Sequence, residues 1–98
     1  MQTGYVYILT NKPRGILYVG VTSGIENRLD LHARTASSFV KKYHLCRLVH
    51  LEEYPTIVEA IEREKQLKNW HRKWKINLIE MHNPHWNDLA RDAETSSA

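Results

Sequence analysis

Cysteine is almost absent from this chain: Cys46 is the only one in 98 residues, so no intrachain disulfide can form. A lone thiol is typical of a reducing compartment. The N-terminus also lacks the basic region followed by a long apolar stretch that a targeting segment would have. No apolar run approaches the roughly 20 residues that a membrane-spanning helix needs. These absences predict a cytoplasmic protein that does not enter a membrane.

Internal repeats, low-complexity tracts and linkers are also missing. A chain of this length has room for one compact domain, and its hydrophobic fraction of 42% is ordinary for a globular protein. We therefore expect a single domain over residues 1–91, followed by a short, polar, flexible tail over residues 92–98.

Strand and helix signals define the expected fold. Residues 5–10 and 16–21 are rich in aromatic and β-branched residues, and the turn residues between them, which include a glycine able to adopt a positive φ, predict an antiparallel hairpin. Residues 47–53 predict a third strand. Capping patterns and apolar spacing predict helices over residues 24–34, 56–69 and 72–81, the last with Trp74, Leu78 and Met81 on one stripe. The order β-β-α-β-α-α predicts an α+β fold: a small, three-stranded, mainly antiparallel sheet flanked by helices.

Positive charge is concentrated rather than abundant. The net charge is only +3, yet residues 63–75 contain six cations and a single acid, Glu64. A second basic pair, Lys41-Lys42, lies in a segment without clear periodicity. This distribution favours a polyanionic partner such as nucleic acid, although a solvated helix face has the same composition.

Glu64 interrupts an apolar stripe. Ile57, Ala60, Ile61 and Leu67 lie at helical spacing, and Glu64 falls on the same stripe, whereas the other acids of this segment fall off it. A carboxylate directed at the body of a domain is costly unless a cation, a metal or hydrogen bonds compensate it. Three interpretations stay open: a functional carboxylate, a buried glutamate paired with an arginine or a lysine, or a stripe edge that reaches solvent.

The first predicted helix and the hairpin contribute further polar candidates. Arg28 and His32 are four residues apart and therefore share one helix face. Tyr7 and Tyr18 lie in neighbouring predicted strands, and Gly20 lies at a strand end, where the missing side chain lets a backbone or a phosphate approach closely. Taken singly, strand tyrosines and a histidine near an apolar face usually have packing roles.

These positions coincide with a known pattern. The segment Tyr5-Val6-Tyr7 and, eleven residues after Tyr7, the segment Tyr18-Val19-Gly20 resemble the paired GIY and YIG motifs of the GIY-YIG nuclease superfamily. The resemblance covers roughly residues 4–90. Within the superfamily, the chain is similar to the small, single-domain bacterial members. Tyr5 stands where the family name has glycine, which leaves Tyr7 intact.

Three more positions carry the resemblance. Arg28, eight residues after Gly20, is similar to the helix arginine of the superfamily, and His32 to the His or Tyr four residues further on. Glu64 is similar to the glutamate of the later helix that binds the metal.

The resemblance implies a divalent-metal-dependent endonuclease, a hydrolase that cleaves phosphodiester bonds and could act in DNA repair or recombination. One Mg²⁺ or Mn²⁺ ion would bind at Glu64, and Arg28 would grip phosphate oxygens. We favour a tyrosine, Tyr7 or Tyr18, as the general base, with His32 orienting it or the water; His32 itself is the rival base.

Lysines outside the catalytic positions would hold the nucleic-acid backbone without reading bases, and we assign this role to Lys41, Lys42, Lys68 and Lys73. No separate base-reading module is evident, so we expect low sequence specificity, DNA rather than RNA as substrate, and specificity supplied by nucleic-acid structure or by a protein partner. The oligomeric state is left open.

Other function classes are also considered. The main alternative is a nucleic-acid-binding module on the same fold with little or no catalysis. A zinc-binding interaction domain is disfavoured because the six histidines and single cysteine lack the usual ligand spacing. Trp70, Trp74 and Trp86 could bind a protein, but we expect them to pack in the core and between helices.

Overall fold

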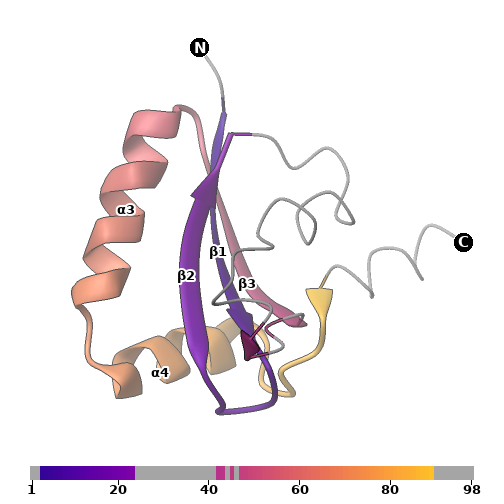
Figure 1. Cartoon of the computed structure of the whole chain (residues 1–98). Helices are drawn as coiled ribbons and strands as arrows, with labels where there is room; N and C mark the ends of the chain where they lie inside the picture. Colours follow the sequence, from indigo (N-terminus) through magenta and orange to yellow (C-terminus); the bar gives the residue numbers. More distant parts are fainter. Residues whose placement is uncertain (1–2, 24–41, 44, 46, 90–98) are drawn as a thin grey trace, which may run out of the picture.

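The structure is a computed structural model that describes residues 3–23, 42–43, 45 and 47–89. Its strands are β1 (Gly4–Thr10), β2 (Leu17–Thr22) and β3 (Arg47–Tyr54), and its helices are α3 (Ile57–Asn69) and α4 (Arg72–His82). The strands form one antiparallel sheet in the order β2-β1-β3, with α3 running alongside the sheet and α4 crossing its lower end (Figure 1). The predicted α+β fold is confirmed; the helix expected over residues 24–34 lies outside the described residues.

The central strand β1 separates two apolar clusters. Val6 and Ile8 are completely buried with Ala60 and Leu67 of α3, whereas Tyr7 and Leu9 belong to a second cluster on the opposite face of the sheet. This alternation follows from the two-residue period of a strand, because successive side chains point to opposite faces. Neither described helix has the length and hydrophobicity that a membrane crossing requires.

The first turn of α3 packs closely against the start of β1. Thr56 caps the helix, and its hydroxyl accepts a hydrogen bond from the Glu59 amide at 3.3 Å, as the capping pattern predicts. A Cβ atom at Gly4 would lie 2.5 Å from the Cβ of Ala60 and 2.8 Å from the Cα of Ile57. The absence of a side chain at Gly4 is therefore what lets the first turn of α3 pack so closely on the sheet.

The apolar stripe predicted for α4 is wrong in part. Ile79 is the fully buried residue of this helix, and Ile76 and Leu78 pack against the core. Trp74 and Met81, which the spacing placed on the inward face, are 53% and 74% exposed. A helix this short and this rich in apolar residues offers more than one stripe at helical spacing, and contact with the sheet selects the one that contains Ile79.

The hairpin turn departs from the expected glycine geometry. Arg14, not a glycine, adopts the positive φ of 57°, and none of the described glycines has a positive φ. The Arg14 guanidinium makes two hydrogen bonds to Glu80 of α4, at 2.9 and 3.0 Å, while Arg72 donates to the carbonyl oxygens of Arg14 and Gly15. These contacts tie the turn to α4 and offset the unfavourable backbone conformation of Arg14.

Asn83 ends α4, as the Asn-Pro pair predicts, and joins the chain beyond the helix to the sheet. Its buried side-chain amide donates to the carbonyl oxygens of Val49 (3.1 Å) and Asn87 (2.9 Å), and its Oδ1 accepts from the Asn87 amide (3.0 Å). One side chain thus satisfies three backbone groups, among them the buried carbonyl of Val49.

We predict that Asn83→Ala lowers the free energy of unfolding by about 1–3 kcal/mol, because buried backbone groups lose their partners. In a domain of this size, each kcal/mol lowers the midpoint of thermal unfolding by roughly 4–8 °C. Asn77→Ala, on the exposed face of α4, is the matched control and should change the midpoint little. Equal midpoints for the two variants would contradict the proposed role of Asn83.

Candidate functional site

Two candidate tyrosines share one face of the sheet. Tyr7 of β1 lies directly opposite Gly20 of β2, and Tyr18 lies opposite Leu9, so Tyr7 and Tyr18 are diagonal neighbours. Their ring centroids are 6.5 Å apart with an interplanar angle of 35°. Tyr7 is only 4% exposed, whereas Tyr18 is partly exposed. The hairpin therefore brings the two phenols together, one buried and one open to solvent.

Gly20 makes room for the Tyr7 ring. A Cβ atom at Gly20 would lie 2.4 Å from both the Cζ and the hydroxyl oxygen of Tyr7, which is far inside van der Waals contact. The far end of the tyrosine thus crosses directly over the backbone of β2. The close approach expected at Gly20 is made by a protein side chain.

Glu64 lies within α3, and its side chain is 15% exposed. Its carboxylate is 3.2 Å from the Nζ atom of Lys68, one helical turn later, and Lys68 is itself largely exposed. Ala60 and Leu67 of the stripe are fully buried, while Ile61 lies at its exposed margin. Glu64 therefore lies where the apolar stripe reaches solvent, mostly covered and paired with an exposed lysine, so all three interpretations of the sequence pattern keep support.

The charge of Glu64 acts on Tyr7. Burial raises the pKa of Tyr7 above its ordinary value of 10.0, and the nearby Tyr18 phenol and Glu64 carboxylate raise it further. The hydroxyl of Tyr7 is therefore protonated throughout the physiological range and can donate a hydrogen bond. The same shift indicates that Tyr7, Tyr18 and Glu64 lie close enough to interact electrostatically.

Three candidates cannot be located. Arg28, His32 and Lys41 lie outside the described residues. Among the residues that the structure describes, no group of three or more His, Cys, Asp or Glu side chains could hold a metal ion. Within this part of the chain, Glu64 is the acid whose charge acts on Tyr7.

The basic segment offers less free charge than its composition suggests. The guanidinium groups of Arg63 and Arg72 are bound to Glu52 and to turn carbonyls, and burial lowers the pKa of Lys75. Lys42 and Lys73 are exposed, and the Nζ atom of Lys42 lies 5.4 Å from the ring centroid of Tyr43. The arginines thus stabilise the fold, and the exposed lysines are available to contact a polyanion.

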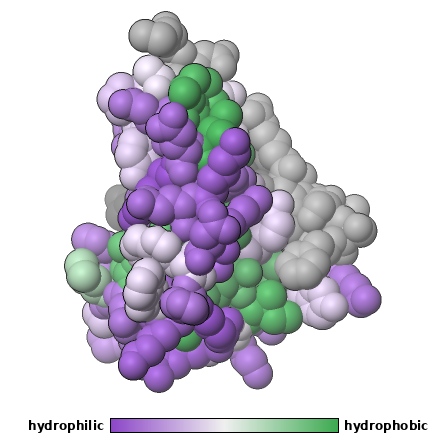
Figure 2. Space-filling view, turned by 90° about the vertical axis from the view of Figure 1, so that its left-hand side faces the viewer, coloured by the Kyte–Doolittle hydropathy of each residue, from purple (hydrophilic) through white to green (hydrophobic). Residues whose placement is uncertain are grey.

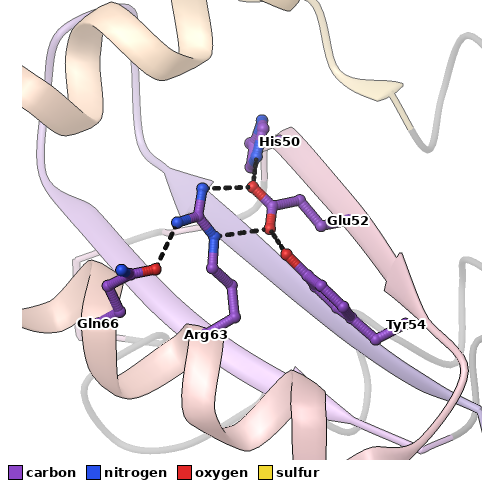
Figure 3. A network of polar contacts seen from close by, with 5 residues as sticks. All are labelled: His50, Glu52, Tyr54, Arg63 and Gln66. Carbon is purple, nitrogen blue, oxygen red and sulfur yellow. Dashed lines mark hydrogen bonds and ion pairs between the residues drawn. The ribbon is translucent and has the colours of Figure 1, made fainter.

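A second polar cluster lies on the face of the sheet that contacts α3, and the sequence analysis missed it (Figure 3). Arg63 donates to both carboxylate oxygens of Glu52, at 2.9 and 3.2 Å. Tyr54 donates to Glu52 at 2.6 Å, and an imidazole nitrogen of His50 lies 2.7 Å from it. Arg63 also donates to Gln66 at 2.6 Å. Glu52 therefore joins β3 to α3 through several charge-assisted contacts.

These contacts decide the ionisation of Glu52. Burial alone would raise the pKa of its carboxyl group, but hydrogen bonds from His50, Arg63 and Tyr54 outweigh burial and hold the pKa well below its ordinary value. The carboxylate is ionised at neutral pH, and it therefore accepts a hydrogen bond from the His50 ring.

A cavity of about 470 Å³ adjoins the Glu52 cluster. His50, Glu52 and Arg63 line it together with Leu78 and His82 of α4 and the segment that follows, and the rings of His50 and His82 are 5.9 Å apart. Tyr7, Tyr18 and Glu64 do not line this cavity. The Glu52 cluster and the tyrosine pair are thus separate features of the sheet.

A signal for the second cluster was present in the sequence. His50, Glu52 and Tyr54 alternate along β3 and so share a face, which is unusual for the side of a strand that packs on a helix. The alternation is obscured because the register of β3 against β1 shifts between Ile8 and Leu9, which puts Val49 in the same core as Ile8.

Comparisons with known proteins match most of the chain to one family. The family model of the GIY-YIG catalytic domain matches residues 3–77. A UPF0213 protein of Syntrophus aciditrophicus (strain SB) is 36% identical over 81 residues, which cover 81% of this chain and 92% of the relative. The UPF0213 protein SH2523 of Staphylococcus haemolyticus (strain JCSC1435) is 33% identical over 81 residues, covering 82% and 98%. No solved structure matches the chain significantly.

We predict that Gly20→Ala displaces the Tyr7 ring, lowers the free energy of unfolding by about 1–3 kcal/mol and moves the pKa of Tyr7 toward its ordinary value. Thermal unfolding and tyrosine titration by nuclear magnetic resonance measure these effects. In a Tyr7→Leu background the same substitution should be nearly neutral, because leucine lacks the atoms that the new Cβ would meet. An equal loss in both backgrounds would refute this account.

We predict that Glu52→Gln destabilises the fold by about 2–4 kcal/mol at pH 7, since it leaves Arg63 without its carboxylate. Because the folded pKa lies below the unfolded value of 4.5, the contribution of Glu52 is fully present above pH 4.5 and is lost as pH falls toward the folded pKa. Urea unfolding at pH 7, 5 and 3 should show the difference from wild type shrinking only below pH 4.5. Glu53→Gln, exposed on the same strand, is the control.

Proposed function

Because the chain belongs to the GIY-YIG family, we propose that it is a divalent-metal-dependent endonuclease that hydrolyses phosphodiester bonds in nucleic acid, DNA in preference to RNA and with low sequence specificity. The observation that carries this proposal is the sheltered carboxylate of Glu64, whose charge reaches the buried phenol of Tyr7 beside Tyr18. A perturbed ionisable group that interacts with a sheltered carboxylate is typical of an active site.

The residues present suit a hard, weakly held cation. Glu64 supplies one carboxylate, and the described residues offer no three-ligand cluster of the kind that a zinc site needs. Mg²⁺ keeps most of its waters and commonly takes one or two carboxylates together with a substrate phosphate, which is compatible with a single glutamate. A bound Mg²⁺ or Mn²⁺ ion would stabilise negative charge on the scissile phosphate.

The raised pKa of Tyr7 bears on its role in the proposed site. Without a bound cation, burial and the neighbouring Tyr18 and Glu64 keep Tyr7 protonated, so its hydroxyl can donate a hydrogen bond to a phosphate oxygen or to the attacking water. A divalent ion at Glu64, together with Arg28, would lower the pKa of a nearby phenol, so Tyr7, Tyr18 and His32 all stay candidates for the general base. Arg28 would grip a phosphate oxygen from the first helix.

Lys68 has a place in this arrangement. Its ammonium group neutralises the Glu64 carboxylate at 3.2 Å, and its largely exposed side chain is free to turn. When a cation binds Glu64, the two positive charges repel each other, and Lys68 would move to a phosphate of the substrate. Lys42 and Lys73, which are exposed, and Lys41 would add contacts to the nucleic-acid backbone.

We predict that Glu64→Ala lowers the rate of metal-dependent cleavage by about 100-fold or more, because it removes the carboxylate proposed to hold the cation. The assay incubates the protein with plasmid, branched DNA and RNA in Mg²⁺ or Mn²⁺. Glu62→Ala is the matched control, since Glu62 is an exposed acid of the same helix, and it should cleave like wild type.

The same panel separates the alternative function. Tight binding without cleavage by the wild-type protein would favour a nucleic-acid-binding module on this fold. Cleavage that is unchanged in Glu64→Ala would reject the assignment of Glu64 whatever its substrate.

A further inference from the structure

Trp74 is a large aromatic side chain left open at the start of α4. It is 53% exposed, and it meets the rings of Trp70 and His71 at nearly right angles, 84° and 89°, with centroids 5.9 and 5.4 Å away. Neither neighbour is stacked parallel on the indole, so a flat group from outside can still lie against it.

Contacts that lead through Trp70 to Arg63 hold Trp74 in position. The Arg63 guanidinium lies 5.0 Å from the ring centroid of Trp70, and the same guanidinium makes the two hydrogen bonds to Glu52. A chain of contacts therefore runs from β3 through α3 to Trp70 and on to Trp74. A ring held in this way loses little side-chain freedom when it binds a partner.

The surroundings of Trp74 are basic. Between residues 65 and 79 the chain carries five cations and no acid: Lys65, Lys68, Arg72, Lys73 and Lys75. Lys65 and Lys73 are exposed, while Lys68 pairs with Glu64 and Arg72 donates to turn carbonyls. Hydrophilic side chains cover most of the surface on the α3 side of the molecule, with apolar groups confined to small patches (Figure 2). This setting disfavours an apolar protein partner or a lipid surface, both of which need a broad apolar face, and it favours a polyanion that also presents flat rings.

We propose that Trp74 is a stacking platform for an unpaired base, with which the protein binds single-stranded segments of its nucleic acid. In a duplex the bases are stacked on one another and their faces are closed, so a duplex offers the lysines only phosphates. An exposed base can lie on the indole while Lys73, the preceding residue, holds the adjacent phosphate. The inference rests on the proposed function only in taking nucleic acid as the ligand; it names the structural class that the protein selects.

The test measures binding without cleavage. A fluorescein-labelled oligo-dT of about 12 nucleotides, a length within the span of single-strand binding sites, is titrated with the full chain in EDTA and followed by anisotropy. Trp74→Ala should weaken this binding about ten-fold or more, as the loss of one stacked base predicts, whereas Trp74→Phe should restore most of it. Affinity for a duplex of equal length should change less than about two-fold, because the lysines remain.

Two controls make the result specific. Met81→Ala removes a more exposed apolar side chain from the same helix and should leave both affinities unchanged. An abasic oligomer of equal length keeps the phosphates but lacks bases, so it should bind wild type and Trp74→Ala alike. Equal single-strand affinities for Trp74→Ala and Met81→Ala, or parallel losses for single strand and duplex, would overturn the proposal.

The outcomes are independent of the nuclease assignment. Trp74-dependent binding by a protein that never cleaves would support the platform and reject the nuclease. Cleavage that requires Glu64, together with single-strand binding that does not change in Trp74→Ala, would support the nuclease and reject the platform.

Discussion

The bidentate contact between Arg63 and Glu52 determines how α3 lies on the sheet. The apolar contacts between α3 and the sheet resist sliding only weakly, whereas two parallel hydrogen bonds to the partly buried carboxylate of Glu52 fix both the rotation and the position of the helix. Glu64 is the next residue, so its direction follows from that of Arg63. The same guanidinium supports Trp70. The carboxylate proposed to hold the cation and the exposed aromatic ring thus depend on one interaction.

The two faces of the sheet place ionisable groups in different surroundings. On the α3 face, Glu52 is partly buried, and hydrogen bonds from His50, Arg63 and Tyr54 lower its pKa. On the other face, burial raises the pKa of Tyr7, and the nearby Tyr18 phenol and Glu64 carboxylate raise it further. Lys68 compensates the charge of Glu64, and in the proposed site a divalent ion would take its place.

The sequence predicted what is local and missed what depends on pairing. All three strands and both described helices lie within two residues of their expected bounds, because caps, turns and β-branched runs are read along the chain. The sheltered position of Glu64 followed from helical periodicity. The Glu52 cluster was missed because a register shift hides it, and Trp74 was misplaced because only the sheet decides which stripe of α4 is covered. In both cases long-range contacts, rather than local propensities, determine where the side chains lie.

Among the described residues, arginine and lysine make different contacts. Arg14, Arg47, Arg63 and Arg72 all donate to protein acceptors that are distant in sequence, as suits a planar group with five fixed donors. Lys42, Lys65 and Lys73 are exposed and keep their hydration. The fold fixes the direction of these four guanidinium groups, so the described side chains that can adjust to a polyanion are lysines. Loose lysine contacts to phosphates do not distinguish nucleic-acid structures, so discrimination has to come from another contact, and the exposed indole of Trp74 can make one.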